Sequence, residues 1–325
     1  MCIRDRSITA ETGRRLNFVV ISLLFAAVVM FSFDKWWIGE APDKSIAVLP
    51  FVNMSGDAAQ EYFSDGISEE LLHRLAQVSE LHVAARTSSF HFKNKNIAVA
   101  EIAAKLGVRS VLEGSVRQAG NNIRVTAQLI NASDGFHLWS KTFDREFDDI
   151  FAIQDEIATE VVDALKVTLL GGEQARLNRH PTEDLAAYDA YLLGRQKMAR
   201  RTSTALQEAV EHFSEAISLD ERYGLAYVGL ADSYVLLGRY GALGDDDVLA
   251  NAVPAIERAL QLDDELGEAH ASLGMVRVLQ RDLPAAEQAF KKSLALSPNY
   301  APAYLGYGLL MRWGFSNPEA ALALH

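Results

Sequence analysis

Cysteine is almost absent from the 325-residue chain, which has one, Cys2, near its N-terminus. A single cysteine cannot form a disulfide within the chain, and it excludes a zinc site built on several cysteines. The motifs GxSxG and GxxxxGK[ST] are also missing, as is a GxGxxG after a strand. A nucleophile elbow or a phosphate-binding loop therefore lacks its required geometry, and we expect no catalytic residues and no cofactor.

Positive charge is scarce as well: 31 lysines and arginines face 43 acidic residues, giving a net charge of −12 and a pI near 5.2. A duplex-binding surface needs a cationic face, so we expect no nucleic acid as a partner of the folded part. The charge is uneven, because residues 1–15 hold four arginines and only two acids. The length allows about two domains of ordinary size, each with its own core.

An uncharged run covers residues 16–33, LNFVVISLLFAAVVMFSF, and a helix there could continue past Asp34 and Lys35 through Trp36, Trp37 and Ile38. Eighteen residues span ~27 Å as a helix, close to the thickness of a bilayer's hydrocarbon core. We predict a transmembrane helix at 16–38 that contacts the lipid bilayer. Arg14 and Arg15 precede it, so the positive-inside rule places residues 1–15 in the cytoplasm and the bulk of the chain on the far side. A cleaved signal peptide is the alternative, although the run exceeds the usual length of its apolar region.

Strand-like and helix-like patterns alternate from residue 45 to residue 165. The apolar run at 46–51 indicates a strand buried on both faces, Asp65 is expected to cap the next helix, and Gly107 to end another in the left-handed conformation. The expected order is β-α-β-α-β-β-β-α, with strands at 46–51, 81–85, 108–117, 123–129 and 136–143 and helices at 65–78, 99–106 and 150–165. This order predicts an α+β fold, with a mixed sheet and helices packed against it.

Several separated strings resemble one known family in the family's own order. They read AVLPFVNMSGD, EYFSDGISEELLHRL, ARTSSF, LGVRSVLEGSVRQAGNNIRVTAQLINASDGFHLWSKTFDRE and DIFAIQDEIA. They look like the TolB-like amino-terminal domain, related to the FlgO-type domain, over residues 44–168. The resemblance implies a membrane-anchored bacterial regulator whose exported part also carries tetratricopeptide repeats. In such regulators the cytoplasmic part is often a winged-helix DNA-binding domain or an adenylate cyclase, and this sequence contains neither.

A 34-residue period follows a polar linker at 169–186. Residues 267–274, GEAHASLG, correspond to residues 301–308, APAYLGYG. Two looser copies precede them, and the second has an insertion at Gly238 to Asp247 that we expect to be a surface loop. The period resembles the tetratricopeptide repeat, which implies an all-α solenoid of about four repeats over 187–325. The last copy is incomplete at His325, so the natural protein is expected to continue.

The repeat resemblance implies a partner-binding groove on the first helix of each copy, at spacing i, i+4, i+7. Apolar side chains with a few charges suit a bound peptide or helix, so we predict a protein or peptide partner there. The groove residues are Tyr191, Arg195, Met198, Val228, Asp232, Val235, Ala271, Met275, Val278, Leu305, Leu309 and Arg312.

A second candidate is a polar cluster that follows strand ends or begins helices, where open sheets often bind ligands. Its members are Ser55, Asp65, Arg86, Ser88 and Ser89, and helix capping is their alternative role. The pair Glu69-Glu70 is expected on a solvated helix face, since neighbours on a helix diverge by ~100°. His82 and His91 lack the spacing of metal ligands, so no metal site is predicted.

These features predict a single-pass protein of the bacterial inner membrane with its bulk in the periplasm. Its function is expected to be non-enzymatic, binding partners or sensing a signal. The alternative is the exported sensory part of a transmembrane adenylate cyclase or winged-helix regulator whose output domain precedes residue 1. The opening letters MCIRDRS resemble translated sequencing-adapter sequence, which favours an artefactual start. A third interpretation, a soluble enzyme exported to the periplasm, would need a catalytic cluster beyond residue 325.

Overall fold

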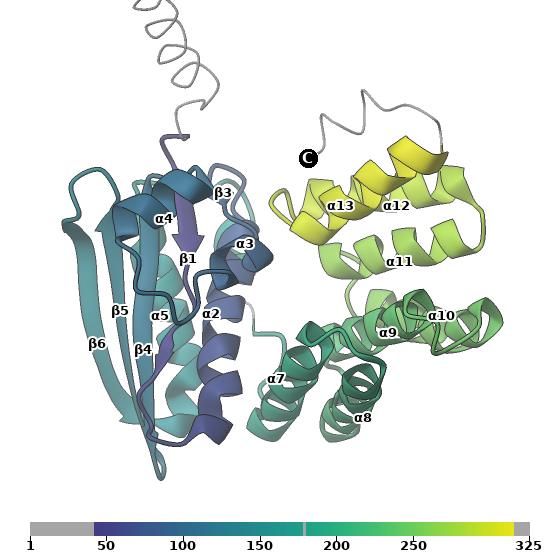
Figure 1. Cartoon of the computed structure of the whole chain (residues 1–325), viewed down its shortest axis with the longest axis horizontal. Helices are drawn as coiled ribbons and strands as arrows, with labels where there is room; N and C mark the ends of the chain where they lie inside the picture. Colours follow the sequence, from purple (N-terminus) through teal and green to yellow (C-terminus); the bar gives the residue numbers. More distant parts are fainter. Residues whose placement is uncertain (1–41, 178–179, 315–325) are drawn as a thin grey trace, which may run out of the picture. The chain divides into compact units, whose positions relative to one another are not determined.

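A computed structural model of the chain describes residues 42–177 and 180–314 (Figure 1). The described residues belong to one compact unit that begins at Pro42. The stub predicted at 1–15 and the transmembrane helix predicted at 16–38 lie outside them. Within the described ranges, every helix is too short or too polar to cross a membrane.

The first half contains a mixed sheet with strand order β3-β1-β4-β5-β6. Neighbouring strands are parallel around β1 and antiparallel from β4 to β6, and a short β2 also pairs with β4. The strands are β1 (Ser45–Val48), β2 (Val52–Asn53), β3 (His82–Val83), β4 (Ser110–Ala119), β5 (Asn122–Asn131) and β6 (His137–Glu146). The predicted mixed sheet is confirmed, and its order of strands and long helices agrees with the predicted one.

Helices cover the two faces of this sheet unequally (Figure 1). They are η1 (Ala58–Gln60), α2 (Glu61–Ala76), α3 (Arg86–Phe90), α4 (Val99–Leu106), η2 (Phe147–Asp149), α5 (Ile150–Ala164) and α6 (Glu173–Leu177). α2 and α5 share one core with β4 and β5, whereas α4 packs Ile102 and Ala103 against Ala47 and Val111 on the opposite face. β1 therefore has helices on both sides, which explains its continuous apolar sequence.

Local sequence sets the ends of several of these elements. Gly107 ends α4 with φ 65°, as predicted for a left-handed C-cap. Gly120, with φ 62°, lies in the two-residue turn between Ala119 and Asn122, which pair across β4 and β5. The prediction for Asp65 is wrong, because α2 begins at Glu61 and places Asp65 inside the helix.

The second half consists of helices that pack in antiparallel pairs (Figure 1). They are α7 (Leu185–Ala199), α8 (Ser203–Leu219), α9 (Gly224–Arg239), α10 (Asp245–Leu262), α11 (Gly267–Leu279), α12 (Leu283–Leu296) and α13 (Ala301–Leu309), followed by a π-helical turn, η3 (Leu310–Gly314). Asp184, Thr202 and Asp282 cap α7, α8 and α12 by accepting backbone N–H hydrogen bonds.

Two buried phenylalanines fill equivalent positions in this helical array. A Cβ on Gly194 or Gly229 would lie 2.8 or 2.5 Å from the ring of Phe213, and a Cβ on Gly274 or Gly306 would lie 2.7 or 2.6 Å from the ring of Phe290. Glycine is therefore required where each first helix crosses the phenylalanine of a second helix.

The expected surface loop at Gly238 to Asp247 is only half as long, because helices extend into it from both ends. α9 continues to Arg239 and α10 begins at Asp245, which leaves residues 240–244 as the connection. The extra residues lengthen the two helices, because Gly238 packs against Val248 and so brings the helix ends together.

One hydrophobic core extends through both halves of the described chain. It joins β1, α2 and α5 to Tyr188 and Tyr191 of α7, Phe213 of α8 and Tyr223, with Leu177 of α6 between them. The two halves therefore share this cluster in addition to clusters of their own, because the apolar surface of α2 is covered by α7 as well as by the sheet.

Candidate functional site

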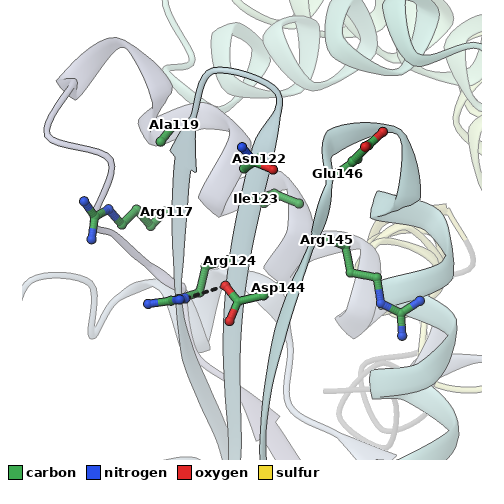
Figure 2. Close-up of a pocket in the computed structure, with 8 residues that line it drawn as sticks. All are labelled: Arg117, Ala119, Asn122, Ile123, Arg124, Asp144, Arg145 and Glu146. Atoms are coloured by element: carbon green, nitrogen blue, oxygen red, sulfur yellow. Dashed lines mark hydrogen bonds and ion pairs between the residues drawn. The ribbon is translucent and has the colours of Figure 1, made fainter.

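A surface depression of ≈ 590 Å³ lies at the tip of β4, β5 and β6, but its charged side chains do not converge (Figure 2). Arg124 Nε donates a hydrogen bond to Asp144 Oδ1 at 2.5 Å on one face of the sheet. Arg145, the next residue along β6, points to the other face and pairs with Glu156 of α5 at 2.6 Å. We therefore do not regard this depression as a site.

A buried ion cluster lies where α2, α5, α6 and α7 meet. Arg74 of α2 is 1% exposed, and its guanidinium contacts Glu70 at 3.0 Å and also Asp155 of α5. Gln154 of α5 donates to the Tyr188 hydroxyl at 2.8 Å and so extends the cluster to α7. Burial alone would lower the pKa of Arg74, but Glu70 and Asp155 outweigh it and hold the pKa above its ordinary value.

Next to this cluster is a cavity of ≈ 510 Å³ between α2 and the loops that precede α7, α9, α11 and α13. This volume falls in the range of small-molecule sites. Its polar lining residues are Glu70, His73, Arg74, Gln77, His180, Thr182, Glu183, Asp220, Arg222, Asp263, Glu265, Glu268 and Ser297. The cavity combines a largely polar lining with several buried side chains, and we take it as the candidate functional site.

The lining of the cavity is strongly acidic. Six carboxylates and two arginines line the cavity, which gives the lining a formal charge of −4 when His73 and His180 are neutral. The N-termini of α9 and α11 also point toward the cavity, and each contributes roughly half a positive charge. The site therefore remains net negative.

Glu268 is the least satisfied of these carboxylates. It is 4% exposed, and neither carboxylate oxygen accepts a hydrogen bond from a residue in the described ranges. His73 Nδ1 lies 3.3 Å from Glu268 Oε1 but does not donate a hydrogen bond to it. A buried carboxylate without hydrogen bonds is costly, so a structure rarely keeps one without a reason.

Helix α2 contacts the array along its whole length. Near its start, Tyr62 donates to Asp189 of α7 at 2.5 Å, and a Cβ on Gly66 would lie 2.5 Å from Leu192. In its middle, Glu69 accepts from Arg195 of α7 at 2.8 Å. After its end, the Asn299 amide donates to the carbonyl of Leu81 at 2.7 Å and lies within 3.4 Å of two other carbonyls.

The predicted groove residues lie on α7, α9, α11, α13 and η3, and their exposure differs. Tyr191, Val228 and Ala271 are each 4% exposed, and Arg195 is held by Glu69. The remaining members are partly buried at Met198, Asp232, Val235, Met275, Val278 and Leu309 and exposed at Leu305 and Arg312. Only the α13 end of the predicted groove is thus well exposed, and α2 covers the α7 end.

Asp232 has an unusual environment on this face. It accepts a hydrogen bond from Ser272 of α11 at 2.6 Å. Burial raises the pKa of Asp232 to about 6, and the Ser272 hydrogen bond and the charge of Arg195 oppose this shift only in part. The carboxylate is therefore poised to gain a proton in mildly acidic conditions.

The predicted polar cluster is not brought together as one site. Ser55 Oγ accepts from the backbone of Gln118 at 2.9 Å, far along β4 from the others. Asp65 pairs with Lys93 at 2.6 Å, and Arg86 pairs with Glu69. Ser88 is exposed, whereas Ser89 is buried with a hydroxyl that has no hydrogen-bond partner among the described residues.

The expectation of a solvated face at Glu69-Glu70 is wrong. Glu69 bridges Arg86 and Arg195, and Glu70 is 5% exposed beside Arg74, because the array covers this side of α2. His82 and His91 are exposed. No short-range pattern in the sequence points to the cavity residues His73 and Glu268, since they are 195 positions apart.

Comparisons with known proteins find similarity to proteins named as transcriptional regulators and to one named as an adenylate cyclase. Residues 42–176 match the family described as HilA/YgeH-like transcriptional regulator, second domain. Putative adenylate cyclase 3 of Rhizobium meliloti is 39% identical over 250 residues, which cover 75% of this chain and 42% of that protein. Transcriptional regulator HilA of Salmonella typhimurium is 24% identical over 123 residues, covering 37% of the chain and 22% of HilA. The chain thus spans less than half the length of these relatives.

Two solved structures show a weak likeness to this chain. TolB from Acinetobacter baumannii matches 42% of this chain and 32% of its own at 16% identity, with a TM-score of 0.29. Lipoprotein GNA1162 from Neisseria meningitidis matches 39% of this chain and 99% of its own at 18% identity, also with a TM-score of 0.29. At these scores neither likeness bears on function. The resemblance to bacterial regulators is confirmed in so far as the relatives above carry the names of a cyclase and a regulator.

Proposed function

We propose that this chain is the sensory and protein-binding part of a membrane-anchored bacterial regulator and that it performs no chemistry itself. The proposed anchor is the segment 16–38, with residues 1–15 in the cytoplasm and the chain after the anchor in the periplasm. The proposed output, adenylate cyclase activity or control of transcription, is carried outside residues 1–325. The similarity to Putative adenylate cyclase 3 and to the HilA second domain supports a regulatory role.

We further propose that the array is built of tetratricopeptide repeats. The equivalent positions of Phe213 and Phe290, each crossed by two glycines, support a repeated helix pair. Such arrays bind helices or extended peptides, and here α2 lies where a bound helix would lie. The exposed α13 end, with Leu305, is then the proposed contact for an external protein partner.

The observation that carries the sensory role is the set of contacts that joins α2 to the array. Asp189, Arg195 and Asn299 hold α2 at its start, in its middle and after its end. A change in the array is therefore transmitted to α2, and from α2 to the sheet that begins a few residues after the proposed anchor.

A first experiment tests the absence of chemistry. The purified chain is incubated with ATP and Mg²⁺ or Mn²⁺, and cyclic AMP is measured by immunoassay. No product above the blank is expected, and cyclic AMP formed in proportion to protein would refute a non-enzymatic role.

A second experiment tests the location. Alkaline phosphatase, which is active only after export, and green fluorescent protein are fused in turn after residue 325. Active phosphatase and dark fluorescent protein are expected. The reverse pattern would exclude the periplasmic location.

A third experiment tests signal transmission in the natural full-length gene. Arg195→Glu places two carboxylates together at Glu69 and is expected to change the output, measured as cyclic AMP or as transcript level, by several-fold. Arg200→Glu makes the same charge change at an exposed position after α7 and is the control. Equal outputs from both variants and the wild type would contradict transmission through α2.

A further inference from the structure

The cavity beside α2 has the charge and shape of a site for a cation. Thr182, Glu70 and Glu268 form a buried floor, and Glu183 and Glu265 are exposed at the rim. Acidic residues at the rim attract positive ligands, and a low-dielectric floor strengthens the attraction inside.

The Glu268 carboxylate offers a bound cation hydrogen-bond acceptors that no described residue uses. Glu70 is already paired with Arg74, and Asp220 accepts hydrogen bonds from Thr182 at 2.6 Å and from its own loop. Glu268 is buried in the wall of the cavity and accepts no hydrogen bond from the described residues, and its contact with His73 at 3.3 Å is an ion pair only when that imidazole is protonated. An N–H donor with positive charge would satisfy it, and such charge-assisted hydrogen bonds are the strong ones.

We infer that this cavity binds a small organic cation whose ammonium or guanidinium group donates to Glu268. The inference deepens the proposed sensory role and rests on it, since the ligand is the signal that the array would pass to α2. A bare metal ion fits less well, because the described residues contain no group of three or more His, Cys, Asp or Glu side chains arranged to hold one. An anion is opposed by the net negative lining.

Three four-carbon probes separate the classes of ligand in calorimetric titrations of the purified full chain. Putrescine carries two ammonium groups, 1,4-butanediol is neutral and succinate carries two carboxylates. Saturable binding is expected for putrescine and not for the other two. Binding of succinate or butanediol in preference to putrescine would overturn the inference. Spermidine and arginine extend the cationic class, and no saturable binding of any of the three cations at up to about 10 mM, well above a millimolar dissociation constant, would also overturn it.

Glu268→Gln keeps the shape of the side chain and removes its charge. It is expected to weaken the binding of the cation about tenfold to a hundredfold, the usual size of a charge-assisted hydrogen bond. Asp264→Asn makes the same charge change four residues away, at an exposed position outside the cavity lining, and is expected to change the affinity less than about twofold. Equal losses of affinity in the two variants would show that the affinity depends on overall charge and not on Glu268, and would overturn the inference.

The melting temperature without ligand provides a second readout. Because Glu268 accepts no hydrogen bond in the unliganded cavity, Glu268→Gln is expected to leave the melting temperature unchanged or to raise it. A fall of several degrees would show that Glu268 is structural and would overturn the inference. The titrations measure cation binding alone and not the regulatory output of the full-length protein. A failure to bind would therefore overturn the cation site but would not contradict the proposed function. A cation that binds but leaves the output of the full-length protein unchanged would instead contradict the sensory role.

Discussion

The most informative perturbation of the fold is Arg74→Met, which removes a buried cation and retains most of the side chain's apolar length. Arg74 is 1% exposed and lies 3.0 Å from Glu70, which is 5% exposed. After the substitution, Glu70 keeps its charge but loses its partner in the interior. The expected result is a loss of about 3–5 kcal/mol in the free energy of unfolding, the usual cost of leaving a buried charge unpaired.

The double variant Arg74→Met/Glu70→Leu tests the cause of that loss. It removes both charges, so the desolvation cost disappears together with the attraction, and replacing a buried pair by apolar side chains is often nearly neutral. Asp155 is less affected, because its side chain is 26% exposed and it lies 3.0 Å from His180. We expect the double variant to fall within about 1–2 kcal/mol of the wild type.

Urea unfolding of the purified chain, followed by circular dichroism, measures both values, provided that the slope of the transition is unchanged. Lys105→Met/Glu101→Leu is the matched control, since this pair has the same i,i+4 spacing but side chains 55% and 56% exposed. It and its single variants are expected to change stability by less than about 0.5 kcal/mol. If Arg74→Met alone costs under ~1 kcal/mol, or if the double variant is as unstable as the single one, unpaired buried charge is not the reason.

Three further outcomes are expected. Phe213→Ala, in the ring position crossed by two glycines, should cost about 3–5 kcal/mol in urea unfolding, and a loss under ~1 kcal/mol would mean that the site collapses freely. Gly114→Ala places a Cβ 2.7 Å from the Phe51 ring and against the Thr126 carbonyl, so it should lower the melting temperature, whereas Gly171→Ala, with open space around it, should not. The raised pKa of Asp232, about 6, means that the folded state holds this proton between roughly pH 4 and 6 while the unfolded state has lost it. Stability therefore falls as pH rises through this window, and Asp232→Asn should flatten the curve; parallel curves for the two proteins would refute the assignment.

Local patterns in the sequence predict much of the first half of the fold. Alternation along 123–129 gives β5, and the left-handed glycine at Gly107 ends α4, because both depend on neighbouring residues. The start of α2 departs from the local pattern, since Asp65 has the chemistry of a cap but the helix begins four residues earlier, where Phe63 and Ser64 are buried. β2 and α3 are too short to produce a periodic pattern.

The candidate site could not be predicted in the same way. Repeat spacing indicates which side chains share one face of α7, α9 and α11, but not that α2 lies against that face. The burial of Glu69 and Glu70, and the meeting of His73 with Glu268, depend on contacts between residues distant in the sequence. Such contacts leave no periodic or short-range signature in a single chain.

The continuous core has a consequence for exchanging parts of this protein with those of its relatives. The cluster shared by α2 and the sheet includes Tyr188, Tyr191 and Phe213 of the array. Without α2 and the sheet, the array would expose these aromatic side chains to solvent. An array grafted from a relative onto this sheet would meet a foreign α2 and leave mismatched tyrosines. A functional chimera must therefore transfer α2 together with the array, even though the two are separated in the sequence by four strands.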